Sequence, residues 1–197
     1  MAHGFLAEGF DMQKRAEISS CGKYRYALSR IWDDEKRKVM FIGLNPSTAD
    51  EEKDDMTIKR CLSYTRQWGY GGIVVANLFA LRSTDPSALM RCADAVGPAN
   101  DSWLRTLAEK AGLIVAIWGN LGSYLNRNLV VKSMFPNLMC LGTTAKGQPH
   151  HTRGLPDGLN PIPLTGIVKP SGRYQTRFGS YEFCSSTISS GQEISLI

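Results

Sequence analysis

The chain has 197 residues, of which 43% are hydrophobic and 21% are charged, and this size and composition predict one globular domain with its own core. No stretch approaches the roughly 18 apolar residues that a membrane span requires, and charged residues near the start argue against a signal peptide, so we expect a cytoplasmic protein without a membrane partner. The net charge of +5 suits a polyanionic partner but does not identify one, because basic proteins without such partners are common.

Cysteines and histidines are few and scattered. The five cysteines never form a Cys-x-x-Cys pair, which argues against a disulfide framework and against a zinc site. The three histidines, His3, His150 and His151, make a poor ligand set for a metal. We therefore expect reduced cysteines, no metal and no cofactor.

The N-terminal part of the chain predicts an arm and one strand. Residues 1–22 show no periodic pattern, which predicts an irregular N-terminal arm. Residues 23–32 alternate apolar and polar side chains, the period of two that is typical of a half-exposed edge strand. The short apolar run at residues 39–44 predicts a buried strand, which we expect to pair antiparallel with residues 23–32.

The buried strand at residues 39–44 ends abruptly at Asn45-Pro46. A strand of a parallel sheet ends in this way when its carboxyl end opens into a loop, and ligands of such sheets bind at these ends. The residues that follow carry an amide, hydroxyls and several carboxylates. One alternative is that Ser47, Thr48 or Asp55 only caps the next helix, but the density of polar groups favours a functional site.

Strands and helices alternate through the rest of the domain. The expected elements are a helix from Asp54 or Asp55 to Trp68, a strand at 73–81, a short helix at 87–92, a helix from Asn100 or Asp101 to Ala111 with Gly112 as its C-cap, a strand at 113–118, a helix at 123–135 and a short strand at 138–141. This order is typical of a parallel sheet with helices on both faces. The expected fold class is therefore α/β, a three-layer sandwich with a mainly parallel four-stranded central sheet plus an antiparallel edge strand. The α/β domain is expected at residues 23–164, followed by a polar C-terminal extension at 165–197.

Two further features remain open at this point. Asn77 lies in an otherwise apolar run, and a buried amide without partners costs about 1 to 3 kcal/mol. It therefore either bonds the loop backbone at the strand end or reads the polar edge of a ligand. Basic and aromatic residues mix in the extension at 165–197, a composition typical of a surface tail and compatible with contact to single-stranded nucleic acid.

The chain carries a set of specific motifs. They are Tyr24-Arg25-Tyr26, Leu44-Asn45-Pro46-Ser47-Thr48-Ala49-Asp50, Asp54-Asp55 with Thr57-Ile58, Trp68-Gly69-Tyr70-Gly71, Asn77-Leu78-Phe79-Ala80 and Trp118-Gly119. Through these motifs the chain closely resembles the bacterial and phage family catalogued as domain of unknown function 1643. Membership of that family implies no activity by itself.

A second and more distant resemblance does imply an activity. Gly43-Leu44-Asn45-Pro46 resembles the first motif of the uracil-DNA glycosylase superfamily, in particular the Gly-x-Asn-Pro form of its mismatch-specific branch. Asn77 is similar to the asparagine with which that superfamily recognises a pyrimidine edge, and Trp118-Gly119 resembles its leucine-tryptophan-glycine strand end. Residues 143–153 occupy the place of the loop that grips DNA beside the lesion. This loop departs from the pattern, because Gln148-Pro149-His150-His151 stands where the superfamily has histidine, proline and serine.

The resemblance implies a glycosylase-like fold and hydrolysis of the N-glycosidic bond of a nucleobase, including modified bases, in nucleic acid or a nucleotide. This reaction passes through an oxocarbenium-like sugar. Asn45 would orient the attacking water, and Asp50, with Asp54 or Asp55 in reserve, would stabilise positive charge or accept the proton. The candidates for base binding are Asn77, Phe79, Ser47 and Tyr70, and the candidates for binding nucleic acid or phosphate are Asn120, Lys146, Gln148, His150, His151 and Arg153. Core packing is the alternative for Phe79.

A function of a different class stays open. The same fold, without hydrolysis, would serve as a sensor or inhibitor that binds a nucleotide or nucleic acid, and the altered loop at 143–153 favours this alternative. A small-molecule transferase is less well supported, because the sequence contains no glycine-rich phosphate loop.

Overall fold

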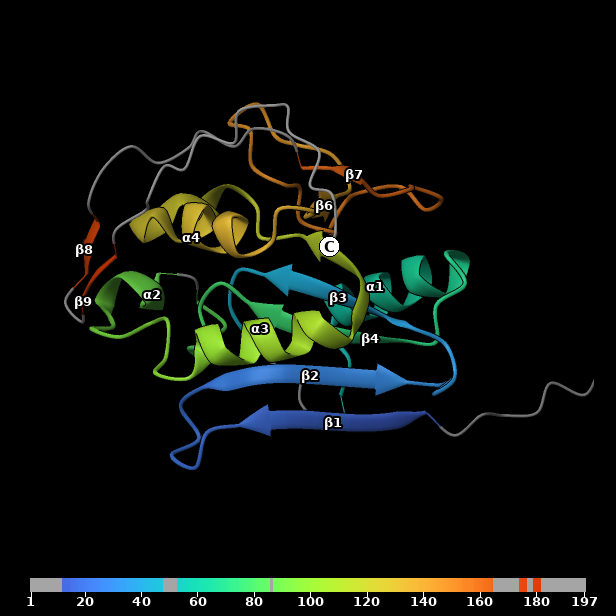
Figure 1. The fold of residues 1–197 in the computed structure, drawn as a ribbon, viewed down its shortest axis with the longest axis horizontal. Helices are drawn as coiled ribbons and strands as arrows, with labels where there is room; N and C mark the ends of the chain where they lie inside the picture. The colour runs from blue at the N-terminus through green and yellow to red at the C-terminus, as the bar shows by residue number, and fades with distance from the viewer. Residues whose placement is uncertain (1–11, 48–52, 86, 165–173, 177–178, 182–197) are drawn as a thin grey trace, which may run out of the picture. The chain divides into compact units, whose positions relative to one another are not determined.

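The computed structural model describes residues 12–47, 53–85, 87–164, 174–176 and 179–181 (Figure 1). The chain divides into two compact units, Met1–Gly166 and Ile167–Ile197. The described part of the second unit is a hairpin in which β8 (Tyr174–Thr176) pairs antiparallel with β9 (Gly179–Tyr181). In the described ranges, no helix has the length and apolar character needed to cross a membrane.

The first unit is built around a seven-stranded mixed sheet, counted over the described residues, with the order β1-β2-β4-β3-β5-β6-β7. Its strands are β1 (Gln13–Ile18), β2 (Arg25–Ile31), β3 (Lys38–Gly43), β4 (Gly72–Asn77), β5 (Ala111–Ala116), β6 (Met139–Cys140) and β7 (Ile162–Pro163). The central strands β4, β3, β5 and β6 run parallel, as predicted. The flanking pairs β1–β2, β2–β4 and β6–β7 are antiparallel, so the sheet has more antiparallel strands than the one that we expected.

The N-terminal strands differ from the prediction. Residues 13–18, expected in an irregular arm, form the edge strand β1, and nearly all of its side chains are exposed. Because neither face of β1 is deeply buried, its sequence shows no apolar alternation. The strand β2 is therefore internal, and it pairs with β4 rather than with β3.

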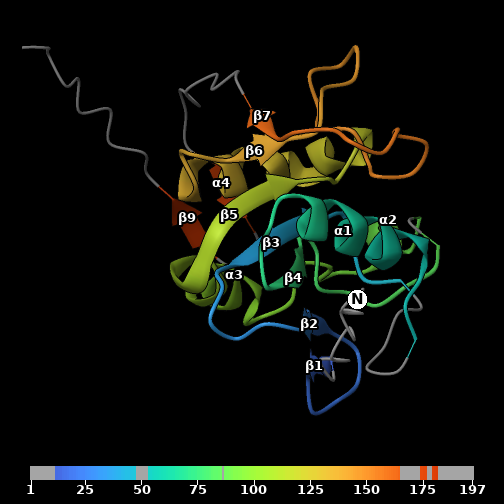
Figure 2. The same cartoon turned by 90° about the vertical axis from the view of Figure 1, so that its right-hand side faces the viewer.

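Helices cover both faces of the sheet, which gives the expected three layers (Figure 2). On one face α1 (Met56–Gln67) packs its buried side chains against residues such as Phe41 and Val75. On the other face α3 (Asn100–Lys110) and α4 (Arg127–Met134) pack against Met40 and Ile42. A short helix, α2 (Ala88–Arg91), lies between β4 and α3 in the chain.

The helix expected at residues 123–135 is divided into two parts. A 3-10 segment, η1 (Asn120–Asn126), precedes α4. Leu125 and Asn126 have φ angles of 52° and 54°, in the left-handed region that no right-handed helix contains. The apolar spacing is continuous through these residues, so the interruption could not be read from the sequence.

The pairing of β1 with β2 contains a register shift. As at a β-bulge, the side chains of β2 before and after this shift follow different alternations between the two faces of the sheet. Tyr24 and Tyr26 belong to the core on the α3 side, whereas Leu28 belongs to the core on the α1 side. Arg25, between the two tyrosines, and Arg30, two residues after Leu28, therefore point to the α1 side. Both arginines are buried, with 4% and 0% of their surface exposed.

The strand order indicates where a ligand of this sheet would bind. The chain passes from β3 to its neighbour β4 and then crosses to β5 on the other side of β3. Ligands of open α/β sheets bind at such a reversal, outside the carboxyl ends of the strands. The loops that follow β3, β4 and β5 therefore border the candidate site.

Candidate functional site

The ends of β3 and β4 place Asn77 beside a glycine. Gly43 and Asn77 are register partners on these parallel strands. A Cβ atom on Gly43 would lie 2.8 Å from Oδ1 of Asn77, so the glycine leaves room for the amide. Asn77 is 4% exposed, and its Nδ2 has no hydrogen-bond partner among the described residues. A buried amide donor is therefore available to an acceptor that the described residues do not supply.

Asn45 joins the loops that follow β3 and β4. Its Nδ2 donates hydrogen bonds to the carbonyl oxygens of Pro46 at 3.1 Å and of Ser83 at 2.9 Å. These two bonds use both amide hydrogens and fix which way the amide points. Oδ1 of Asn45 is thereby held in a defined direction as a hydrogen-bond acceptor.

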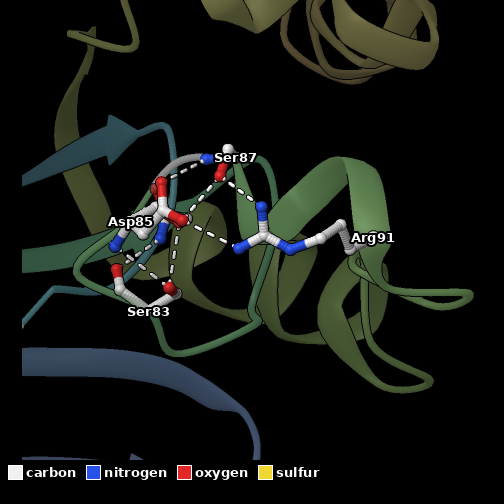
Figure 3. A network of polar contacts seen from close by, with 5 residues as sticks. Ser83, Asp85, Ser87 and Arg91 are labelled. Atoms are coloured by element: carbon white, nitrogen blue, oxygen red, sulfur yellow. Dashed lines mark hydrogen bonds and ion pairs between the residues drawn. The ribbon is translucent and has the colours of Figure 1, made fainter.

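The loop that carries Ser83 is itself held by a polar network (Figure 3). The Asp85 carboxylate accepts hydrogen bonds from the Ser87 hydroxyl at 2.5 Å, from the Ser87 N–H at 2.9 Å and from Arg91 Nη2 at 2.8 Å. The bonds from Ser87, followed by Arg91, lower the pKa of Asp85 to about 2. This network ties the loop to α2, and so it stabilises the position of the Ser83 carbonyl that Asn45 contacts.

The carboxylates nominated for catalysis have structural partners where the structure describes them. Asp54 Oδ1 accepts a hydrogen bond from Nε of the buried Arg30 at 2.8 Å. Asp55 is the N-cap of α1, and its Oδ1 accepts from the Ile58 N–H at 2.9 Å. The alternative that Asp55 caps the helix is thus confirmed, whereas Asp50 lies outside the described residues. Ser47, nominated for base binding, is exposed on the loop after Asn45.

The structure places the two aromatic candidates for base binding, Phe79 and Tyr70, in different surroundings. Phe79 is fully buried and its ring lies 5.8 Å from that of Tyr124, which agrees with the alternative of core packing. Tyr70 follows α1 and adjoins Gly112, whose Cβ would lie 2.9 Å from Tyr70 Cε1. Gly112 is near the start of β5, whereas Asn45 follows the end of β3. Tyr70 and Asn45 therefore lie at opposite ends of the parallel strands. The structure therefore does not bring Tyr70 together with Asn45 and Asn77.

Residues 143–149 form a small hairpin that is fixed to the domain. Thr143 pairs with Pro149, and the Thr144 N–H donates to the Gln148 carbonyl at 2.8 Å. Oε1 of Gln148 accepts from Trp118 Nε1 at 3.0 Å and from Asn128 Nδ2 at 3.2 Å. The amide oxygen of Gln148 is thus used inside the protein.

The other polar candidates near the hairpin differ in accessibility. Asn120 Oδ1 accepts from the Thr144 hydroxyl at 2.7 Å, whereas Lys146 is exposed at the hairpin tip. The N–H of His150, a partly buried residue, donates to the Gly142 carbonyl at 2.9 Å. Asn120 is exposed as well, so both Asn120 and Lys146 are accessible to a ligand.

His151 lies near the N-terminus of α1. Its Nδ1 accepts the Arg153 N–H at 3.0 Å, so in the neutral ring the proton is on Nε2. Burial and the charge of Arg153 lower the pKa of His151, and Asp55 opposes this shift. His151 is therefore neutral near pH 7 and offers an Nε2–H donor. Among the described residues, no group of three or more His, Cys, Asp and Glu side chains could hold a metal ion.

Sequence reasoning missed the buried arginines of β2. An edge strand would expose Arg25 and Arg30, and only the internal position of β2 buries them. Arg25 lies at the end of β2 near the strand ends of the site, because its N–H donates to the Ala80 carbonyl at 2.9 Å. Its place in Tyr24-Arg25-Tyr26 was the signal that could have identified it.

Comparison with known proteins places most of this domain in one family. Residues 25–152 match the family model described as "Protein of unknown function (DUF1643)". The match includes β3, α1, β4 and β5 and the candidate residues from Asn45 to His151. No curated protein and no solved structure matches the chain.

Proposed function

The chain belongs to the DUF1643 family, and we propose that it hydrolyses the N-glycosidic bond of a nucleobase, either unmodified or modified, in a nucleic acid or nucleotide. The observation that carries this proposal is the buried Asn77 amide, whose Nδ2 has no partner among the described residues. Asn77 ends β4, and Asn45 follows the end of the neighbouring strand β3. Both groups border the crevice expected at the reversal of strand order.

Asn77 suits recognition of a base that presents a carbonyl oxygen. Its Oδ1 lies against Gly43, and its Nδ2 offers two hydrogens to an acceptor. Leaving this donor unpaired costs about 1 to 3 kcal/mol, and a base carbonyl would recover that free energy. This supports a binding position for a keto base beside Asn77.

Asn45 suits orientation of the attacking water. The bonds from its Nδ2 to Pro46 and Ser83 fix the amide, so that Oδ1 can accept a hydrogen from water. An amide does not remove a proton, and the sugar cation requires a nearby negative charge. Asp50 remains the nominated carboxylate, since Asp54 and Asp55 already bond Arg30 and the first turn of α1.

His151 suits the departing base. In its neutral form Nε2–H can donate a hydrogen bond to the negative charge that develops on the base as the bond breaks. The lowered pKa of His151 keeps this form dominant at neutral pH. A hydrogen bond from a neutral imidazole requires no prior protonation of the ring.

Formation of abasic sites tests the proposal. The protein is incubated with oligonucleotides that carry uracil, mismatched bases or hypermodified bases, and alkali-labile breaks are measured. We expect breaks with the native chain and their loss in Asn45→Ala and Asn77→Ala. Asn137→Ala, which removes an exposed amide on the turn before β6, is the matched control and should keep activity. Breaks that persist in both site variants would refute these roles.

A non-catalytic binding module is the second candidate. It is favoured by the structural use of the Asp54 and Asp55 carboxylates and of the Gln148 amide oxygen. This candidate predicts that the same oligonucleotides bind, that Asn77→Ala weakens binding, and that no base is released. Fluorescence anisotropy measured beside the cleavage assay distinguishes the two functions.

A further inference from the structure

The outer edge of β1 carries no further strand among the described residues. β1 is the first strand in the order of the large sheet, with β2 on its inner side (Figure 1). In an antiparallel pair, every second residue directs its backbone N–H and C=O groups away from the partner strand. The outer edge of β1 therefore presents a row of hydrogen-bond donors and acceptors, which is a template for pairing with a strand of another chain.

The sequence of β1 permits such pairing. The six residues Gln13–Ile18 include neither proline nor glycine, the two residues that interrupt or weaken a strand. The register shift between β1 and β2 lies between Glu17 and Ile18, at the end of the strand. Most side chains of β1 are exposed, and Ile18 is an apolar residue with 39% of its surface exposed. An added strand would therefore find a regular backbone along most of β1.

The charges of β1 are arranged so that they complement a second copy of the same strand. Charged side chains on an edge strand usually oppose pairing with another chain. In β1, however, Arg15 and Glu17 have opposite charges and lie on either side of Ala16. Residues two positions apart point to the same face of a strand. An antiparallel copy of β1 presents these two charges in the reverse order, so that opposite charges meet.

The symmetry of a dimer selects one register. Where two identical strands pair antiparallel about a two-fold axis, one residue lies opposite its own copy. A charged residue in this position would place like charges opposite each other, which is destabilising, and a terminal residue would pair only the strand ends. Ala16 is the only residue of β1 that is neither charged nor terminal. With Ala16 on the axis, Arg15 lies opposite Glu17 of the second copy, and Lys14 lies opposite Ile18 of the second copy.

From these features we propose that β1 pairs antiparallel with β1 of a second copy of this chain, with Ala16 at the two-fold axis. Backbone hydrogen bonds between the two β1 edges join the sheets of the two chains into one continuous sheet. The Arg15–Glu17 pair occurs twice, once on each side of the axis, and it fixes the register. Since the pairing uses the β1 edge of both chains, association through β1 ends at the dimer. The pairing is independent of the function proposed above.

Analytical ultracentrifugation of the full chain over a series of concentrations tests the dimer. We expect the native chain to pass from the monomer mass to twice that mass as its concentration rises. Arg15→Glu and Glu17→Arg each turn both cross-strand pairs from attractive to repulsive, so each variant should dimerise about tenfold more weakly. An equal mixture of the two variants should dimerise again, because the carboxylates of one chain then lie opposite the guanidinium groups of the other.

Arg105→Glu is the matched control for the change of charge. Arg105 is an exposed arginine on α3, so its reversal should leave dimerisation nearly unchanged. Equal weakening by Arg15→Glu and Arg105→Glu would show a general effect of charge and would overturn the inference. A native chain that stays monomeric at every concentration would overturn it as well, as would a mixture of the two β1 variants that does not dimerise.

A disulfide tests the register directly. Residues opposite each other in an antiparallel pair have Cα atoms about 4.5 to 5.5 Å apart, a separation that a disulfide spans. In a Cys21→Ser background, which removes an exposed thiol, Ala16→Cys should form a covalent dimer under mild oxidation. Lys14→Cys should react much more slowly, because Lys14 does not lie opposite its own copy. Equal or faster cross-linking of Lys14→Cys would overturn the proposed pairing.

Discussion

The amide oxygen of Asn77 lies so close to Gly43 that a Cβ atom on the glycine would be 2.8 Å away. The two residues are register partners at the carboxyl ends of neighbouring parallel strands. The absence of a side chain at Gly43 therefore determines where the Asn77 amide can lie. In Gly43-Leu44-Asn45-Pro46, Gly43 makes room for the amide of Asn77, and Asn45 carries the second amide of the candidate site.

Replacing Gly43 with alanine should displace the Asn77 amide. The added methyl group overpacks a buried site, which costs about 1 to 3 kcal/mol of the free energy of unfolding. We expect this loss in urea denaturation, together with loss of base release or of ligand binding.

A double variant separates the clash from other effects of the substitution. In Gly43→Ala/Asn77→Ala the amide is absent, so the free energies of the two single substitutions should not add. Strictly additive values would show that the methyl group disturbs something other than Asn77.

The parallel centre of the sheet could be predicted from the sequence for a physical reason. Strands buried on both faces appear as short continuous apolar runs, and the runs that became β3, β4 and β5 each end in polar or glycine-rich loops. Chain order and the handedness of crossovers then place these loops at one edge. This reasoning placed Asn45 in a loop at that edge, whereas Asn77, expected inside a strand at 73–81, is the last residue of β4.

The antiparallel flank could not be predicted because its signals are weak or misleading. In β1 the side chains are mostly exposed, so the strand has no apolar period. In β2 the bulge reverses the faces between Tyr26 and Leu28, which a simple alternation does not reveal. The burial of Arg25 and Arg30 follows from these tertiary pairings.

The location of a candidate residue is easiest to predict when the residue directly follows a strand. Tyr70 lies apart from Asn45, beside Gly112 near the start of β5, because a motif shared with a family does not show at which end of the strands a residue lies. Gln148 looked accessible in a polar loop, but Trp118 and Asn128 both donate to its amide oxygen. Both partners come from distant parts of the chain, and no local pattern predicts such contacts.

Breaking the pair between Arg30 and Asp54 should destabilise the fold. Arg30 is fully buried and Asp54 is 16% exposed, so Asp54→Asn would leave a buried guanidinium without this counter-charge. Loss of one partner of a buried pair costs about 3 to 5 kcal/mol, and we expect the lower end because Asp54 retains some contact with water. Thermal and urea unfolding measure the loss.

The exposed pair of Lys38 with Asp34 provides the matched control. The Asp34 side chain is 66% exposed, and surface pairs contribute about 0 to 1 kcal/mol. Asp34→Asn should therefore have a much smaller effect. Similar losses in both variants would show that burial of Arg30 does not determine the strength of its pair.

Asp85 should make stability depend on pH in the acidic range. Its pKa falls from 3.8 to about 2 in the folded protein, chiefly through the bonds from Ser87 and Arg91. A carboxyl group with a lowered folded pKa stabilises the protein above the unfolded pKa, and this contribution is lost as the pH falls toward the folded pKa. The stability difference between native protein and Asp85→Asn should thus be constant from pH 7 to about 5 and shrink as the pH falls from 3.8 toward 2.

Urea unfolding at a series of pH values measures this difference. Glu35→Gln, which removes an exposed carboxylate in the turn before β3, is the matched control for the loss of one surface charge. A difference between native protein and Asp85→Asn that stays the same down to pH 2 would contradict the assignment.

The cysteines should differ strongly in reactivity toward thiol reagents. Cys21 is exposed, and the hydroxyl of Ser19, 3.3 Å from its sulfur, lowers the pKa of the thiol. Burial raises the pKa of Cys61 and of Cys140. Because the thiolate is the reacting form, Cys21 should be labelled before Cys61 and Cys140 in the folded protein, and these two should react only after unfolding.

Peptide mapping by mass spectrometry follows each of these residues. Ser19→Ala should slow the labelling of Cys21, because the thiol pKa rises. Rapid labelling of Cys61 in the native chain would instead show that the α1 side of the core opens readily, since α1 packs this cysteine against the sheet.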